Sequence, residues 1–142
     1  MSNLDLDLAD ELRAAVGEFV RRGRRDDRMP QGQAAVLGYL DRSGAMSIAE
    51  LARLEQVKHQ SMTRTVNLLS DQGLVALAKD ELDRRQIVVA ITSAGERALG
   101  EERYRRASRI ARAIRDDLTD GEQEIVRQLP EILRKLRPDA GA

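Results

Sequence analysis

The sequence has no cysteine, few aromatic residues and no long apolar run. Of its 142 residues, none is cysteine and only 2% are Phe, Trp or Tyr. The absence of cysteine excludes disulfides, thiolate metal sites and thiol-based redox sensing. No apolar stretch approaches the roughly 18 residues of a membrane-spanning helix, and the acidic start lacks the features of a signal peptide. We therefore expect a cytoplasmic protein with no membrane partner.

Residue types that carry catalysis are also scarce. His59 is the one histidine in the sequence. We find no glycine-rich phosphate loop and no spacing of His, Asp and Glu that is typical of a metal site. We therefore expect no enzymatic activity, no cofactor and no bound metal.

Charge is abundant but balanced. Charged residues make up 34% of the chain and the formal net charge is zero, which by itself argues against a nucleic-acid partner. The distribution favours one, however, because the only ionisable residues between Gln56 and Ser70 are Lys58, His59 and Arg64. The local field, rather than the total charge, determines contact with phosphate.

Apolar residues at helical spacing predict three helices before that region. The first runs from Leu4 to about Arg25, and the second from Pro30 to about Asp41. The third begins with the capping box Ser47–Glu50 and ends near Glu55. The basic run at 21–25 has two interpretations, namely solvated cations at a helix end and a supplementary phosphate contact.

The stretch from Val57 to Val75 predicts a longer helix with two unlike faces. Its apolar residues Val57, Met62, Val66 and Leu69 lie on one face, and Gly73 provides a stop. The adjoining face is polar or basic and free of acids: Lys58, His59, Gln60, Ser61, Thr63, Arg64 and Asn67. Such a face suits a major groove, although an ordinary amphipathic helix with a solvated face is the alternative.

Two short strands are predicted directly after this helix. Leu74–Ala78 and Gln86–Ile91 alternate in hydrophobicity and enclose a polar loop at 79–85. A short helix, a turn, a longer helix and a two-stranded ribbon together make a winged helix-turn-helix. The wing arginines suit a minor groove; a surface ion pair of Asp83 with Arg85 is the alternative.

The last third of the chain predicts two more helices. One runs from Ser93 to about Asp117, and the other opens with the capping box Thr119–Glu122. Pro130 should kink or split the last helix near Leu129. The terminal helices carry more apolar surface than a winged helix needs, which favours a homodimer.

The run SIAELARLEQVKHQSMTRTVNLLSDQGLV, followed by DRRQIVVAIT and AG, resembles the MarR-type winged-helix transcriptional regulators. The matching features include Gly73-Leu74-Val75, Asp83-x-Arg85 and Thr92-x-x-Gly95. The resemblance extends over nearly the whole chain. It implies a mainly α, α+β fold in one domain at 1–142: a winged helix-turn-helix at 30–92, flanked by dimerisation helices at 1–29 and 93–142.

The resemblance also implies a function. It predicts a sequence-specific DNA-binding transcriptional repressor that binds a near-palindromic operator in double-stranded DNA as a homodimer. The helix face from Lys58 to Asn67 would contact bases and phosphates. Arg85, oriented by Asp83 and accompanied by Arg84, would enter the minor groove. A winged helix that binds a protein instead of DNA is the rival function.

Three positions depart from the family pattern. Lys58 stands where a serine or threonine cap is common, Ala78 where a basic residue is frequent, and Glu81-Leu82 where the wing usually has proline or glycine. The family resemblance further implies release from DNA by a small-molecule effector. Because the only aromatic residues are Phe19, Tyr39 and Tyr104, we expect a mostly aliphatic effector cleft or no ligand.

Overall fold

The structure is a computed structural model that describes residues 2–138. Residues 1 and 139–142 of the predicted 1–142 domain lie outside the described residues. Contacts divide the chain into two compact units, Met1–Arg105 and Arg106–Ala142. No helix within the described residues is long and apolar enough to cross a membrane.

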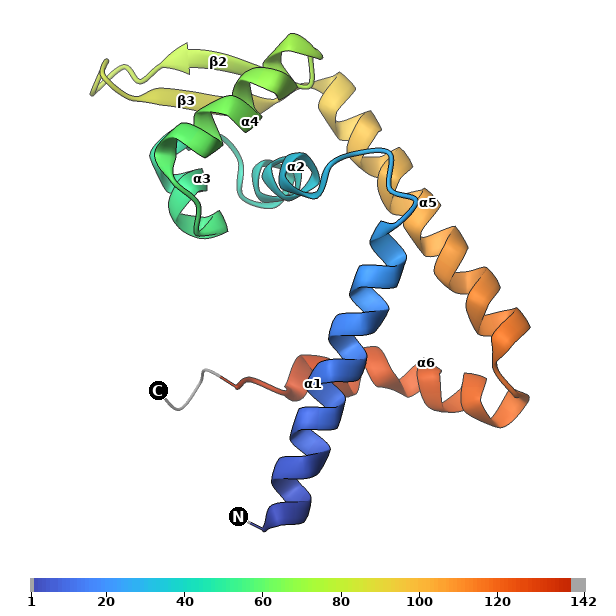
Figure 1. Cartoon of the computed structure of the whole chain (residues 1–142). Helices are drawn as coiled ribbons and strands as arrows, with labels where there is room; N and C mark the ends of the chain where they lie inside the picture. The colour runs from blue at the N-terminus through green and yellow to red at the C-terminus, as the bar shows by residue number, and fades with distance from the viewer. Residues whose placement is uncertain (1, 139–142) are drawn as a thin grey trace. The chain divides into compact units, whose positions relative to one another are not determined.

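The elements follow the predicted order (Figure 1). They are α1 (Asn3–Arg24), α2 (Gln31–Ser43), β1 (Met46–Ser47), α3 (Ile48–Glu55), α4 (His59–Asp71), β2 (Val75–Lys79), β3 (Ile87–Ile91), α5 (Ser93–Asp117) and α6 (Asp120–Lys135). The mainly helical fold with a winged helix-turn-helix is therefore confirmed.

Local signals explain where the helices of the DNA-binding region begin and end. Pro30 precedes α2 with a fixed backbone angle, φ −54°, and Gly44 follows it at φ +82°, a value that favours glycine. The Ser47 hydroxyl accepts the Glu50 N–H at 3.1 Å and so caps α3. The reciprocal bond of the predicted capping box is absent from the hydrogen bonds of the described residues.

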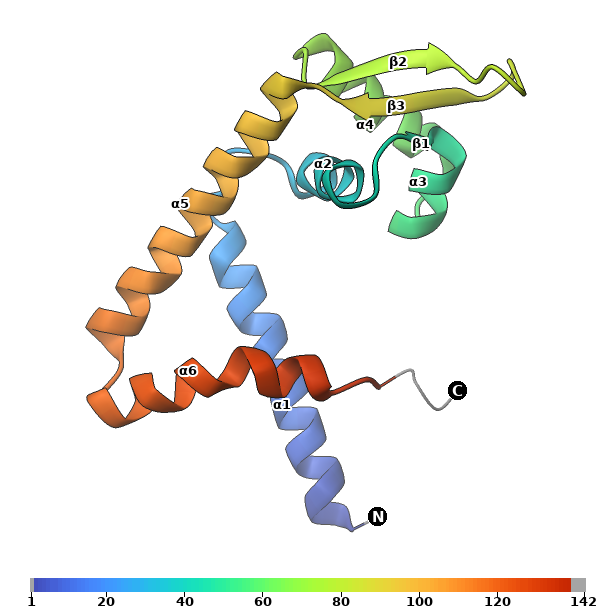
Figure 2. The same ribbon diagram turned by 180° about the vertical axis from the view of Figure 1, so that it is seen from behind.

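The sheet has one more strand than the sequence predicts. Its order is β1-β3-β2, all antiparallel, with β2 and β3 paired from Val75↔Ile91 to Lys79↔Ile87. The predicted two-stranded wing is present, and β1 adds to its inner edge through Met46↔Val89 (Figure 2). A strand of two residues is too short to show alternation, so that the sequence does not predict it.

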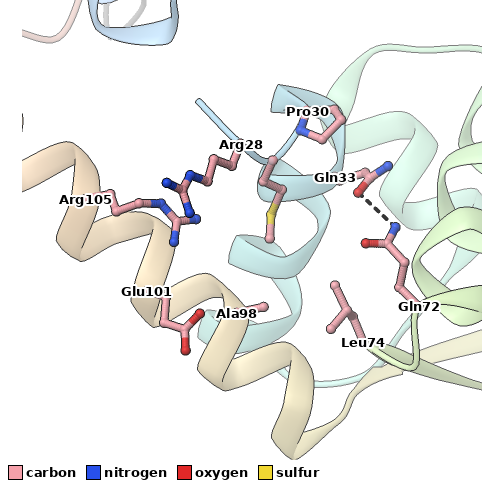
Figure 3. Close-up of a pocket in the computed structure, with 9 residues that line it drawn as sticks. Arg28, Pro30, Gln33, Gln72, Leu74, Ala98, Glu101 and Arg105 are labelled. Carbon is pink, nitrogen blue, oxygen red and sulfur yellow. Dashed lines mark hydrogen bonds between the residues drawn. The ribbon is translucent and has the colours of Figure 1, made fainter. Parts of the chain in front are cut away.

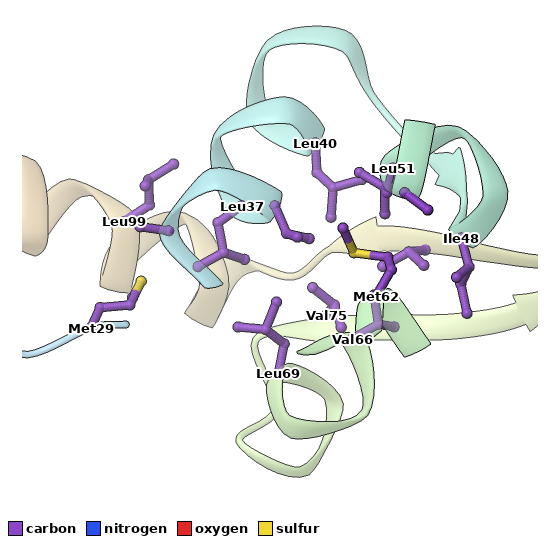
Figure 4. Close-up of a cluster of buried hydrophobic side chains, with 14 residues drawn as sticks. Met29, Leu37, Leu40, Ile48, Leu51, Met62, Val66, Leu69, Val75 and Leu99 are labelled. Carbon is purple, nitrogen blue, oxygen red and sulfur yellow. The ribbon is translucent and has the colours of Figure 1, made fainter. Parts of the chain in front are cut away.

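Buried apolar side chains from several elements form one core under the sheet (Figure 4). Met62, Val66 and Leu69 come from the inner face of α4, as predicted, whereas Val57, predicted for the same face, precedes the helix and is exposed. Leu37 of α2 and Val89 of β3 are fully buried against them. The core thereby fixes which face of α4 is turned outward. Its fully buried large apolar side chains are Leu37, Leu40, Leu51, Met62, Leu69, Val36, Val66 and Val89.

The start of α5 is held tightly against the start of β2. The Thr92 hydroxyl donates to the Gly73 carbonyl at 2.7 Å and accepts the Gly95 N–H at 3.1 Å. The Thr92 N–H donates to the Leu74 carbonyl at 3.1 Å. A Cβ atom on Gly95 would lie 2.1 Å from that same carbonyl oxygen. Thr92-x-x-Gly95 therefore joins the wing to the long helix.

In the second unit, α6 begins at a complete capping box. The Thr119 hydroxyl accepts the Glu122 N–H at 3.2 Å, and the Glu122 carboxylate accepts the Thr119 N–H at 3.0 Å. These bonds hold the pKa of Glu122 below its usual range. The predicted split near Leu129 is wrong, because α6 continues through Pro130 to Lys135. Proline removes only one N–H donor, and the remaining helical bonds keep the helix continuous.

Candidate nucleic-acid interface

A tight turn joins α3 to α4. Gln56 adopts a left-handed conformation, φ 57° and ψ 44°, and the Val57 N–H donates to the Ala52 carbonyl at 3.0 Å. Gln56 is the only non-glycine residue at positive φ within residues 2–138. The turn thus achieves without glycine the chain reversal that a helix-turn-helix requires.

The polar face predicted from the sequence is the outward face of α4. All but one of its predicted contact residues are exposed, and Thr63 is half-buried. Gln60, Arg64 and Asn67 follow one another at helical spacing, opposite the buried Met62 and Val66. No hydrogen bond or ion pair to another described residue engages these three side chains. Their donors and acceptors therefore remain available to a ligand. The exposed residues are Lys58, His59, Gln60, Ser61, Arg64 and Asn67.

The threonine hydroxyls of α4 are less available to hydrogen-bond a ligand than the side-chain amides of Gln60 and Asn67. The Thr63 hydroxyl donates to the His59 carbonyl at 2.9 Å, and the Thr65 hydroxyl donates to the Ser61 carbonyl at 3.1 Å. Bonds of this kind return a side-chain donor to the helix's own backbone. Thr63 can still accept a hydrogen bond or contact a thymine methyl group.

Lys58 is the residue that precedes α4. Its backbone is extended, φ −67° and ψ 148°, and no side chain of the described residues caps the helix. The predicted departure from a serine or threonine cap is therefore accommodated by starting α4 at His59. The first turn of α4 contains no acid, so that the positive end of the helix dipole and Lys58 favour an anion together.

The wing loop at residues 80–86 is ordered by two aspartates. The Asp80 carboxylate accepts the Leu82 N–H at 2.8 Å and the Asp83 N–H at 3.3 Å. The Asp83 carboxylate accepts both the Arg85 N–H and the Arg85 Nε–H at 3.2 Å. The Arg85 side chain is nevertheless 92% exposed, and Arg84 is also exposed.

A cavity of about 260 Å³ lies beside the C-terminal end of α4 (Figure 3). The Gln72 amide donates to the Gln33 amide oxygen at 3.2 Å across one wall. Arg105, on another wall, is ion-paired with the fully buried Glu102. The lining combines polar and charged side chains with apolar ones. It consists of Arg28, Met29, Pro30, Gln33, Gln72, Leu74, Ala98, Glu101 and Arg105.

No group of three or more His, Asp or Glu side chains that could hold a metal ion occurs in residues 2–138. The polar side chains of this region are instead spread along one helix face and one hairpin. Together, the exposed face of α4 and the adjoining wing define a winged helix-turn-helix of the DNA-binding class.

Comparison with known proteins agrees with the winged helix-turn-helix class. Residues 29–86 match the model of the MarR family. An uncharacterised HTH-type transcriptional regulator of Mycobacterium bovis is 31% identical over 139 residues, which cover 96% of each chain. The chain belongs to the MarR family and is a DNA-binding transcriptional regulator. The resemblance inferred from the sequence is thus confirmed.

Two solved structures share the fold. A protein of Pseudomonas aeruginosa PA01 described as a transcriptional regulator has a TM-score of 0.82 at 27% identity, over 95% of this chain and 96% of that one. A MarR family protein from Bacillus stearothermophilus has a TM-score of 0.73 at 22% identity, with the same coverage of both chains, 95% and 96%.

Some features of this region carry no signal that sequence reasoning could use. The Gln33–Gln72 hydrogen bond joins residues far apart in the chain. The turn between α3 and α4 has Gln56 at its left-handed position, where a glycine would have indicated a turn in the sequence. The DNA contacts assigned to the α4 and wing residues stay predictions.

Proposed function

We propose that the protein is a homodimeric repressor that binds a near-palindromic operator in double-stranded DNA. In this proposal α4 lies in the major groove and the wing arginine lies in the minor groove. The observation that carries the proposal is the outward face of α4, where Gln60, Arg64 and Asn67 are exposed and unengaged by other described residues. Exposed amide and guanidinium groups on a helix are the groups that read base edges.

The side chains of α4 divide by chemistry. Arg64 suits the O6 and N7 acceptors of guanine, whereas Gln60 and Asn67 suit the N6 donor and N7 acceptor of adenine. Lys58, His59 and Ser61 lie at the start of the helix, where its dipole favours a phosphate. Thr63, whose hydroxyl hydrogen is committed to the backbone, supplies a methyl contact or an acceptor.

The wing completes the proposed contact surface. Asp83 holds the Arg85 side chain at its Nε atom, 3.2 Å away, while leaving the outer guanidinium nitrogens exposed. An arginine that is both oriented and exposed suits a narrow minor groove, in which the negative potential is concentrated. Arg84, also exposed, supplies a phosphate contact.

The terminal helices support the proposed dimer. Leu4, Leu8 and Phe19 of α1 are each more than half exposed in the isolated chain. Ile125, Leu129 and Ile132 of α6 recur on one helical face and are also exposed. Apolar faces of this extent favour burial against a second copy. We therefore assign DNA binding to residues 30–92 and dimerisation to residues 1–29 and 93–142.

The cavity beside α4 supports release by a small-molecule effector. Arg28, Glu101 and Arg105 line it, and Arg105 is already paired with Glu102, so that Arg28 is the cation that would favour a small carboxylate as the ligand. Gln72 follows the last residue of α4 and bonds Gln33 of α2 in the same wall. A ligand that competes for either amide would change how α4 is held. It would shift DNA binding only if it bound the conformation with the broken Gln33–Gln72 bond more tightly than the conformation that binds DNA.

The proposal is tested by selecting DNA from a randomised duplex library with the full-length protein. We expect a selected duplex with two related half-sites, bound by two copies of the chain, and bound far more tightly than a scrambled duplex. Placing that duplex in a promoter should lower transcription in vitro. Arg85→Ala should weaken binding and reduce the slope of log Kd against log salt by about one. Equal affinity for selected and scrambled duplexes would refute the proposal and favour a protein-binding module.

A further inference from the structure

We propose that Leu82, at the tip of the wing, is a further DNA-contacting residue that places its side chain against the walls of the minor groove. The inference rests on the proposed DNA contact of the wing. The proposed contact of the wing with the minor groove otherwise rests on charged residues alone, and Leu82 adds an apolar contact to it.

Leu82 is an outlier in exposure. It is 99% exposed, more than any other large apolar residue in the described chain. A single exposed leucine is common on protein surfaces. Leu82, however, projects from the one loop that lies between the two strands of the wing, next to Arg84 and Arg85.

The backbone of Leu82 is held in place. Its N–H donates to the Asp80 carboxylate at 2.8 Å, and the next N–H, that of Asp83, donates to the same carboxylate oxygen at 3.3 Å. The Asp80 N–H donates to the Gln86 carbonyl and the Gln86 N–H to the Asp83 carbonyl, at 3.0 and 2.9 Å, which closes the base of the loop. An apolar side chain on an ordered turn binds at a lower entropic cost than one on a flexible loop.

Two of the three acids of the loop, Asp80 and Asp83, are used to build it, whereas Glu81 is exposed. Asp80 accepts backbone N–H groups and Asp83 accepts from Arg85, so that both carboxylates are hydrogen-bonded within the loop. Lys79, Arg84 and Arg85 balance Asp80, Glu81 and Asp83, which makes residues 79–85 neutral overall. A neutral tip that ends in leucine suits the deoxyribose walls of a groove better than the charged phosphates outside it.

The chemistry of the groove predicts a sequence preference as well. Apolar side chains, leucine among them, are used by minor-groove proteins as wedges against the base steps. The exocyclic amino group of guanine projects into the minor groove and is missing from A·T pairs. Leu82 should therefore favour A·T pairs beneath the wing.

The experiment measures affinity and salt dependence on the duplex selected by the wild-type protein. Leu82→Ala should weaken binding about tenfold, because it removes most of an apolar side chain that becomes buried on binding. Its salt slope should equal that of the wild type, because no cation is lost. Leu82→Met, which retains the apolar volume, should bind within about twofold of the wild type. Arg85→Ala is the matched comparison, since it should lower the slope.

A base substitution separates the minor groove from other sites. Replacing the A·T pairs beneath the wing by G·C should weaken wild-type binding, and replacing them by inosine·C, which lacks the amino group, should restore it. Leu82→Ala should reduce this difference. Wild-type affinity in Leu82→Ala, with Arg85→Ala still impaired, would overturn the role of Leu82 and leave the proposed function standing. Loss of selective binding in the wild type itself would remove both.

Discussion

At the residue scale, two residues just before α4 are of types that are unusual at their positions. Gln56 is left-handed at φ 57°, a conformation that costs a non-glycine residue about 1 kcal/mol or more. Lys58 occupies the cap position of α4 without a capping bond from any described side chain. Lys58 places a basic side chain at the start of α4, where the proposed contact with DNA phosphate would be made. Gln56 has no role in the proposed DNA contact.

We expect Gln56→Gly to stabilise the protein. The backbone N–H of residue 56 keeps its bond to the Arg53 carbonyl at 3.2 Å, while the left-handed strain is relieved. After the greater entropy of glycine in the unfolded chain is subtracted, the net gain should be about 0.5–1 kcal/mol. Chemical denaturation measures it, with Gln56→Ala as the control that keeps the strain. A Gln56→Gly variant no more stable than Gln56→Ala would show that the turn is not strained.

At the scale of elements, the junction between wing and long helix depends on close backbone approach. A Cβ atom on Gly95 would meet the Leu74 carbonyl oxygen at 2.1 Å and the Ile91 Cγ1 atom at 2.8 Å. Gly100, one turn further along α5, has nothing within 4 Å of such an atom. The same substitution at the two positions should therefore have opposite effects.

We predict that Gly95→Ala destabilises the protein by about 3 kcal/mol, because a backbone carbonyl cannot move aside as a flexible side chain can. Gly100→Ala should stabilise it by about 1 kcal/mol through helix propensity alone. Thermal or urea denaturation followed by circular dichroism measures both. If Gly95→Ala were as stable as Gly100→Ala, α5 would not be seated against β2 as described.

The elements that could be predicted from the sequence are those with local signals. The hydroxyls of Ser47 and Thr119 predict where helices start, and Gly73, which has no side chain, predicts where one ends. The alternation of apolar residues predicts the strands of the wing. The outward face of α4 could be predicted for the same reason, since helical period alone separates Arg64 from the buried Val66.

What could not be predicted depends on distant parts of the chain. The two residues of β1 become a strand only by pairing with β3. Glu102 is fully buried although its neighbours in the sequence are charged, because its environment is set by tertiary packing. The polar lining of the cavity brings together the α1–α2 linker, α2, α5 and the end of α4, and no local pattern announces such a convergence. The continuity of α6 through Pro130 likewise exceeds what residue propensity indicates.

At the scale of the whole molecule, the terminal helices differ from the DNA-binding region in how their apolar residues are used. The winged region buries Leu37, Leu40, Leu51 and Leu69 in a shared core, whereas the leucines of α1 and α6 remain exposed in a single chain. An operator with two half-sites requires two winged regions at a fixed separation. Dimerisation through the terminal helices would provide that separation.

Neighbouring residues of α6 provide the test of the dimer. Ile132 lies on its apolar face, 48% exposed in the isolated chain, whereas Glu131 lies on the opposite face. Ile132→Arg should convert the dimer to a monomer in analytical ultracentrifugation and weaken operator binding, because a charge would be buried at the interface. Glu131→Arg introduces the same side chain and should remain dimeric. A dimeric Ile132→Arg variant would exclude this face of α6 from the interface.

The affinity of Arg64→Ala for DNA tests the central claim most directly, because that claim is that the outward face of α4 reads base sequence. Equilibrium titration at fixed salt should compare the selected duplex with a scrambled one, with Arg127→Ala, an exposed arginine of α6, as the control of equal charge. We predict that Arg64→Ala loses about 1–3 kcal/mol on the selected duplex, roughly ten- to a hundredfold in Kd, and much less on the scrambled one. Wild-type affinity for the selected duplex, or an equal loss on both duplexes, would contradict the account.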